Sequence, residues 1–317
     1  MATQRVEHTE VQPPVARSAT GGRKPTDPGT FTPYLFMVPY LVLFVVFVLV
    51  PAVFGIWISL HNWDYLLPGK PWVGLKNYAD LFTPNSANSV PFWNSMEATG
   101  KFTLFSMPPL VVIPLLVALI LNQSFRGRNF FRAVYFAPYV LGVAVIGILW
   151  RFLLDPNVGL VNYYLGVLGM EKVPWITALP WAWVSLVGVT VWWTLGFNAV
   201  IYLAGLQDID PELYNAAKVD GANRWQRFVY VTMPGLRPVF VFVVTVTILA
   251  SANMFGQSYI ITQGAPGEET TTAIMYIAET GLRQFNMGAA AAMSYVLALA
   301  LLLVSIVNFA VFRNRGD

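Results

Sequence analysis

The sequence predicts an all-α integral membrane protein with six transmembrane helices. Hydrophobic residues make up 56% of its 317 residues and charged residues only 11%. A typical soluble domain has about 25% charged residues. Six largely apolar windows follow one another along the chain. Each is about as long as the roughly 20 helical residues that cross a hydrocarbon core of about 30 Å. The chain contains no cysteine, which excludes disulfides and thiolate chemistry.

The first 32 residues precede the first window and are rich in Pro, Thr, Gly, Arg and Glu, with no apolar period. This composition predicts a disordered tail at residues 1–32, followed by a membrane domain at residues 33–317. The first 30 residues hold no continuous apolar core, so we do not expect a cleavable signal peptide.

The six predicted spans share long apolar runs, and several contain prolines. Within a helix bundle, neighbouring helices can bond the carbonyls that a proline leaves free, so we expect kinked but continuous helices. A loop with short amphipathic pieces separates the third span from the fourth. The spans are 34–60, 102–121, 133–154, 181–205, 239–261 and 287–312.

The distribution of Lys and Arg over the connections predicts the orientation. Thirteen of the 19 basic residues fall in the two tails, the second connection and the fourth connection, and the other six fall on the opposite side. Cytoplasmic loops carry the excess of positive charge. Both termini and the polar loop at residues 206–238 are therefore expected in the cytoplasm.

The centres of the spans contain no Asp, Glu, Lys or His, and Arg151 lies near a predicted outer end. Proton- and ion-coupled transporters commonly place ionisable groups at mid-membrane depth. A secondary transporter or channel acting without an ATPase partner is thus disfavoured. It stays open as the alternative, because sodium sites can be built from carbonyls and hydroxyls alone.

The polar loop at residues 206–238 carries clear helix signals. Asp208 and Asp210 are N-cap candidates, and Pro211 suits a first helical position, which predicts a helix over residues 211–219. Gly221 can end that helix in a left-handed conformation. Asn223 is expected to cap a second helix that Pro234 stops near residue 231. On composition alone, an ordinary capped loop explains these signals equally well.

A resemblance favours a more specific interpretation. The run Asn215-Ala216-Ala217-Lys218-Val219-Asp220-Gly221-Ala222, with Trp225, Phe228 and Pro234 after it, resembles the Glu-Ala-Ala loop of importer-type ABC permeases. Other stretches resemble the sugar-importing, maltose-type branch of that family, and the matches extend over residues 33–312. They are the segments at 72–78, 127–138, 262–266 and 288–294.

This resemblance implies the type I ABC importer permease fold and a set of partners. In that family the loop docks into a cleft on a cytoplasmic ATPase. The leading Glu of the family is Asn215 here, which replaces an ion pair with a neutral hydrogen bond of about 1 kcal/mol. The implied docking residues are Asn215, Ala216, Ala217, Asp220, Gly221 and Ala222.

The fourth span carries a candidate substrate surface. Thr190, Trp193, Thr194 and Phe197 follow an i, i+3, i+4, i+7 spacing and so share one helical face. Hydroxyls beside aromatic rings suit a sugar, although such stripes are more often helix packing. The resemblance implies substrate contacts at Trp193, Thr194 and Phe197, and on the next helix at Ser251, Asn253 and Gln257.

The sequence lacks the motifs for nucleotide binding, metal binding and catalysis. No Gly-rich Walker loop is present, so we expect ATP and Mg to be bound by a partner ATPase and no cofactor by this chain. The only histidines are His8 and His61, too few for a metal site. A polytopic membrane enzyme is disfavoured because no acid and base are paired in the spans.

The sequence therefore predicts a permease subunit that is not itself an enzyme, in the cytoplasmic membrane of a bacterium or archaeon. The expected partners are a second permease, two ATPase subunits, an extracytoplasmic solute-binding protein, a sugar or oligosaccharide substrate and the lipid bilayer, with no nucleic acid.

Overall fold

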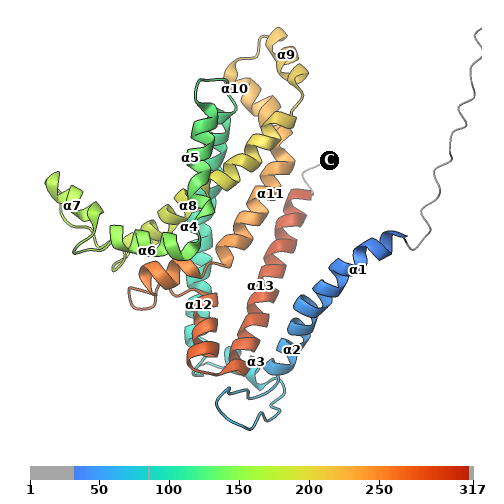
Figure 1. Cartoon of the computed structure of the whole chain (residues 1–317), viewed down its shortest axis with the longest axis vertical. Helices are drawn as coiled ribbons and strands as arrows, with labels where there is room; N and C mark the ends of the chain where they lie inside the picture. The colour runs from blue at the N-terminus through green and yellow to red at the C-terminus, as the bar shows by residue number, and fades with distance from the viewer. Residues whose placement is uncertain (1–31, 85, 314–317) are drawn as a thin grey trace, which may run out of the picture. The chain divides into compact units, whose positions relative to one another are not determined.

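The computed structural model describes residues 32–84 and 86–313, and every element in those ranges is helical (Figure 1). The chain divides into two compact units, Met1–Ala52 and Val53–Asp317. Residues 1–31 of the predicted tail lie outside the described residues. The first predicted span is helical as expected. It consists of α1 (Thr32–Phe44), a π-helical turn η1 (Val45–Leu49) and α2 (Val50–Ser59), with the division between the units inside α2.

Long apolar helices form the body of the second unit. Over the described residues, five helices are long and apolar enough to cross a membrane, or six if one bent pair counts as a span. The fourth and sixth predicted spans are confirmed as α8 (Trp181–Asp208) and α13 (Met287–Arg313). The second is part of α4 (Ser89–Leu121), which packs extensively against α8.

Helix α4 begins at Ser89, well before the predicted start at residue 102. Its 33 residues correspond to about 50 Å at 1.5 Å per residue, more than a hydrocarbon core needs. The added segment carries an ion pair between Lys101 and Glu97, 2.9 Å apart and one turn apart along the helix. The apolar pattern marks only the part of a helix that suits lipid, so the polar extension was missed.

The third predicted span is wrong as a single helix. Instead, α5 (Arg128–Val140) and α6 (Val143–Leu153) meet at a bend of 96°. Leu141 and Gly142, between them, have extended backbone conformations. Two poor helix formers lie here, Pro138 in the last turn of α5 and Gly142 in the break itself.

The fifth predicted span is displaced, and Pro234 does not stop a helix. One continuous helical segment runs from Arg224 to Ala252 through α10 (Arg224–Arg227), η2 (Phe228–Thr232) and α11 (Met233–Ala252). The π-helical turn η2 ends at Thr232, two residues before Pro234, and shifts the bonding register, since Met233 N–H donates to the Phe228 carbonyl. A widened turn of this kind lets a helix accept a local distortion. The helix ends near Asn253, and a short π-helical turn η3 (Ser258–Thr262) follows.

A neighbouring helix bonds the carbonyl that Pro114 leaves free, as expected for a proline in a bundle. Pro114 has no N–H to donate to the carbonyl of Leu110, four residues earlier. Asn198 on α8 donates its side-chain N–H to that oxygen at 3.1 Å. A second buried polar contact, Ser106 Oγ to Ser251 Oγ at 3.1 Å, joins α4 to α11.

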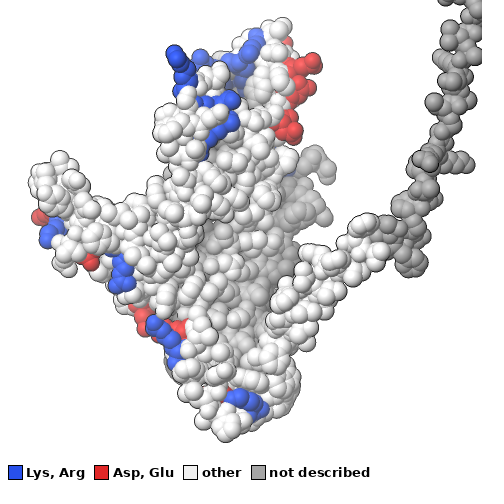
Figure 2. Space-filling model, in the orientation of Figure 1, with Lys and Arg blue, Asp and Glu red and all other residues white. Residues whose placement is uncertain are grey.

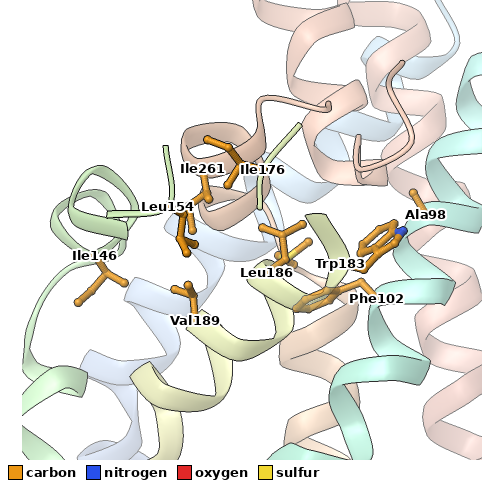
Figure 3. Close-up of a cluster of buried hydrophobic side chains, with 10 residues drawn as sticks. Ala98, Phe102, Ile146, Leu154, Ile176, Trp183, Leu186, Val189 and Ile261 are labelled. Atoms are coloured by element: carbon orange, nitrogen blue, oxygen red, sulfur yellow. The ribbon is translucent and has the colours of Figure 1, made fainter. Parts of the chain in front are cut away.

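Short helices complete the second unit. They are α3 (Lys76–Phe82), α7 (Leu160–Val167), α9 (Pro211–Val219), α12 (Ala273–Ala278) and the π-helical turn η4 (Glu279–Arg283). Side chains of α4, α6, α8 and η3 pack together in a buried apolar cluster (Figure 3).

Candidate functional site

A pocket of about 450 Å³ brings together every residue predicted to contact substrate. A volume of this size lies in the usual range for small-molecule sites. We call it the pathway pocket. Its walls come from α4, α5, the start of α6, α8, α11 and the segment after α11. The predicted residues that line it are Thr190, Trp193, Thr194, Phe197, Ser251, Asn253 and Gln257.

Aromatic rings form one wall of the pathway pocket. Tyr139 of α5 stacks on Phe197 of α8 with 4.8 Å between ring centroids and 18° between planes. Trp193 lies 6.5 Å from the same Tyr139 ring. Flat ring faces of this kind can contact the C–H surface of a sugar ring.

The indole of Trp193 also contacts the bend between α5 and α6. Its Nε1–H donates to the Leu141 carbonyl at 3.0 Å, in the short segment where the helical bonding stops. The hydrogen bond fixes the orientation of the ring that faces the pocket. The pocket wall and the bend are thereby physically joined.

Three of the hydroxyl and amide groups of the pocket donate to their own helices. Thr190 Oγ1 donates to the Leu186 carbonyl at 2.7 Å, and Thr194 Oγ1 donates to the Thr190 carbonyl at 2.8 Å. Asn253 Nδ2 donates to the Leu249 carbonyl at 2.7 Å. The oxygen lone pairs of these groups can still accept hydrogen bonds. No Asp, Glu, Lys, Arg or His lies among the lining residues, so the site suits an uncharged ligand that carries hydroxyl donors.

Sequence reasoning missed other residues of the pathway pocket, including Tyr139, Asn198, Thr247 and Phe255. Thr247 lies four residues before Ser251, so helical spacing was a signal that could have found it. Its buried Oγ1 has no hydrogen-bond partner among the described residues. Tyr139 had no such signal, because it reaches the pocket only through the packing of α5 against α8.

The predicted docking loop forms two capped helices. Asp210 caps α9 by accepting the backbone N–H of Glu212 at 2.8 Å. Asn223 and Gln226 form a reciprocal capping box at the start of α10. The prediction of a helix over residues 211–219 is confirmed, with the same boundaries.

Helix α9 ends in a Schellman motif, in which backbone N–H groups bond back to the last turn. Gly221 has φ +79°. Its N–H donates to the Lys218 carbonyl at 3.1 Å, and the N–H of Ala222 donates to the Ala217 carbonyl at 2.9 Å. The motif sets the turn between the two helices. Of the predicted docking residues, Asn215, Ala216, Asp220 and Gly221 are exposed, and Ala217 and Ala222 are half-buried.

Helix α9 is anchored to the end of the helix bundle. The hydroxyls of Tyr214 and Thr232 are 2.9 Å apart, which links α9 to η2. Tyr214 also packs on the buried cluster that contains Leu206 and Ile209. Helices α9 and α10 lie at the opposite end of the second unit from α3 (Figure 1).

Charged side chains gather at the α9–α10 end of the second unit and, apart from these, along the edge that runs from the α7 arm down toward α3. A wide uncharged surface separates the two groups (Figure 2). Lys and Arg side chains are prominent at the end that carries α9 and α10. Among the described residues, no group of three or more His, Cys, Asp or Glu side chains is placed to hold a metal ion.

Comparison with known proteins places these features in context. Residues 102–314 match the sequence profile of the family described as binding-protein-dependent transport system inner membrane component. A probable ABC transporter permease protein y4oQ of Sinorhizobium fredii is 34% identical over 272 residues, which cover 85% of this chain and 86% of the relative.

Two further relatives carry names that specify sugars. The arabinooligosaccharides transport system permease protein AraP of Bacillus subtilis is 33% identical and covers 90% of each chain. The trehalose/maltose transport system permease protein MalF of Thermococcus litoralis is 32% identical over 90% of this chain and 94% of the relative.

A solved structure shares the fold. A chain from the crystal structure of a bacterial ABC transporter involved in the import of the acidic polysaccharide alginate superposes with a TM-score of 0.77. The alignment covers 90% of this chain and 96% of the other at 24% sequence identity. The predicted importer permease fold is therefore confirmed.

Proposed function

The chain belongs to the family of binding-protein-dependent transport system inner membrane components, and from this membership we propose that it forms half of a translocation pathway for a sugar or oligosaccharide. It is a multi-pass membrane protein of an ATP-driven importer. The observation that carries the substrate class is the pathway pocket, which combines stacked aromatic rings with hydroxyl and amide acceptors and has no charged lining. The names of the relatives, which specify arabinooligosaccharides and trehalose or maltose, support the same class.

The pocket chemistry favours a sugar over other small solutes. A phosphate or a carboxylate would need a charged or densely donating site, and one unpaired charge in a low-dielectric site costs several kcal/mol. A sugar presents C–H faces to the rings of Tyr139, Trp193 and Phe197 and hydroxyl donors to the acceptors. The apolar and the polar parts of the sugar surface are therefore both matched by the pocket.

The energy for transport comes from partner subunits in this proposal. The sequence has no Walker loop, so two cytoplasmic ATPases bind ATP and Mg and hydrolyse the nucleotide. They contact the exposed α9–α10 loop through Asn215, Ala216, Ala217, Asp220, Gly221 and Ala222. Asn215 contributes no charge, so this contact depends on small residues and shape.

The remaining partners complete the importer. A second permease supplies the other half of the pathway. An extracytoplasmic solute-binding protein docks on the outer segments 72–78 and 262–269. Both termini lie in the cytoplasm with the α9–α10 loop, because most Lys and Arg residues fall on that side. ATP-driven closure of the ATPases rotates the helices around the pathway pocket and alternates its access.

The test is reconstitution with and without an ATPase. The chain is purified with its genomic neighbours and checked for a stably bound ATPase. Uptake of maltose and arabinooligosaccharides into liposomes is then measured with the solute-binding protein present. We expect uptake only from the complex, and only with ATP. Uptake by the purified chain alone would contradict the proposal and support a secondary transporter or channel.

A further inference from the structure

A second pocket of about 440 Å³ lies beside η3, α12 and η4, and its volume nearly equals that of the pathway pocket. Figure 1 shows α12 well away from the α9–α10 end of the unit. In contrast to the pathway pocket, charged and amide side chains converge on it. Its polar lining includes Tyr259, Gln263, Glu268, Tyr276, Glu279 and Arg283.

One face of a short helical segment connects the two pockets. Phe255 lines the pathway pocket, whereas Tyr259 and Gln263 line the second pocket. The backbone N–H of Tyr259 donates to the Phe255 carbonyl at 2.9 Å, so the two residues are one helical turn apart. Their rings stack with centroids 5.1 Å apart and planes at 24°. An aromatic surface thus continues from one pocket into the next.

The polar groups of the second pocket are held in place by their neighbours. Arg283 donates to the Tyr259 hydroxyl at 3.0 Å and lies 3.8 Å from a carboxylate oxygen of Glu279. Its guanidinium is 5.6 Å from the centroid of the Tyr259 ring. Gln263 accepts a hydrogen bond from Arg151 at 3.1 Å. The side chain of Arg283 is 64% exposed, so its remaining N–H donors are open to a ligand.

Hydrogen-bond acceptors line the same pocket. Glu268 has φ +70°, an uncommon conformation for a residue other than glycine, and it forms no salt bridge among the described residues. The phenol of Tyr276 lines the same pocket and can both donate and accept a hydrogen bond. A cavity of this size that combines carboxylates, an amide, a guanidinium and two tyrosines offers both donors and acceptors to vicinal hydroxyl groups.

We propose that the second pocket is an additional saccharide subsite, which holds further units of an oligosaccharide while another unit occupies the pathway pocket. The inference rests on the proposed function and adds that the substrate is longer than one pocket can hold. The stacked Phe255 and Tyr259 rings provide the surface over which the chain of sugar rings passes. Gln263 and Glu268 belong to segment 262–269, the proposed docking surface of the solute-binding protein. The other polar residues of the second pocket, Tyr259, Tyr276, Glu279 and Arg283, lie outside that segment.

The experiment compares substrates of different length. The complete transporter, in liposomes with its binding protein, is given maltose through maltohexaose and the arabinooligosaccharides from two to six units. Tyr259→Ala and Glu279→Gln each remove part of the second pocket and lie outside the proposed docking segment 262–269. We expect the KM for chains of three or more units to rise about tenfold, the effect of losing one or two ligand hydrogen bonds or a ring contact. Uptake of the two-unit sugars should stay within about twofold of the unmodified transporter.

Two further variants separate the contributions. Tyr259→Phe keeps the ring and removes the hydroxyl that Arg283 contacts, so it should retain most of the affinity for long chains. Glu171→Gln removes an exposed carboxylate that lies outside the pocket and serves as the charge-matched control. Binding of the solute-binding protein to each variant is measured by pull-down.

The outcomes are distinguishable. An equal loss for all lengths, with weaker binding-protein pull-down, would assign the pocket to docking and overturn the subsite. Unchanged KM for every length would also overturn it. If the unmodified transporter takes up none of these sugars, the proposed function fails first, and the subsite fails with it.

Discussion

Trp193 contributes to two structures at once. Its ring lines the pathway pocket, and its indole N–H bonds the Leu141 carbonyl at the bend between α5 and α6. A ligand that displaces the ring would strain this hydrogen bond. Occupancy of the pocket and the geometry of the bend are therefore expected to depend on each other.

The two roles of Trp193 can be separated by substitution. Trp193→Phe keeps an aromatic face and loses the hydrogen bond, so uptake should fall by about fivefold, as for one hydrogen bond of about 1 kcal/mol. Trp193→Ala combined with Asn253→Ala should lower uptake by tenfold or more, since a ring contact and an amide contact are both removed. Uptake kinetics and the amount of assembled complex are measured together. Trp192→Ala is the matched control, because Trp192 lines a different, apolar groove. Unchanged rate and preference in the double variant would remove the site assignment.

Asn198 stabilises the bundle by donating a hydrogen bond to the Leu110 carbonyl, to which Pro114 has no N–H to donate. Asn198→Leu leaves the Leu110 oxygen without this donor, and we expect a loss of about 1 kcal/mol, in line with buried polar contacts in membrane proteins. Pro114→Ala restores an N–H within α4, so the same Asn198→Leu change should cost less in that background. Thermal unfolding of the detergent-solubilised protein measures the four members of the cycle. Equal costs in both backgrounds would contradict the pairing.

At the scale of elements, local turn chemistry was predictable from the sequence and long-range distortions were not. The capping and turn contacts join residues only a few positions apart in the chain, and α9 has the predicted boundaries. They involve Asp210, Pro211, Gly221 and Asn223. The bend after α5 involves Trp193, which lies 52 residues from Leu141 along the chain. The helix continues past Pro234 with the π-helical turn η2 just before it, and the amino-acid composition does not predict this turn.

The Schellman turn after α9 gives a prediction for the loop as an element. Gly221→Asp should abolish ATP-driven uptake, because it adds a second carboxylate beside Asp220 on a surface that the ATPase is proposed to cover. Open space surrounds a side chain at this position, so the permease should still assemble in the membrane. Gly221→Asn is the matched control, since Asn has a similar shape without the charge and tolerates a positive φ. Wild-type uptake by Gly221→Asp would contradict the docking role.

At the scale of the whole molecule, the candidate site was half predictable. The residues predicted on α8, at the end of α11 and after α11 share helical faces or match a known family, and all of them line one pocket. The wall contributed by α4 and α5 depends on tertiary packing. Phe102 is one of many apolar residues in its span, and Tyr139 is one of several aromatic residues on α5. Only the packing of the helices distinguishes them from their neighbours as residues of the pocket.

The orientation in the membrane is a whole-molecule prediction that the absence of cysteine makes simple to test. Single cysteines are placed at Val219 on α9, which is 88% exposed, and at Leu66 before α3, which is 68% exposed. The chain is expressed without an ATPase, so that nothing covers α9. The excess of Lys and Arg on the α9–α10 side predicts that a membrane-impermeant maleimide labels Leu66→Cys in intact spheroplasts.

Val219→Cys should react only after the membrane is permeabilised, and the unmodified chain, which has no thiol, gives the background. Labelling of Val219→Cys in intact spheroplasts would invert the topology. It would place the α9–α10 loop out of reach of any cytoplasmic ATPase, and with it the proposed source of energy for transport.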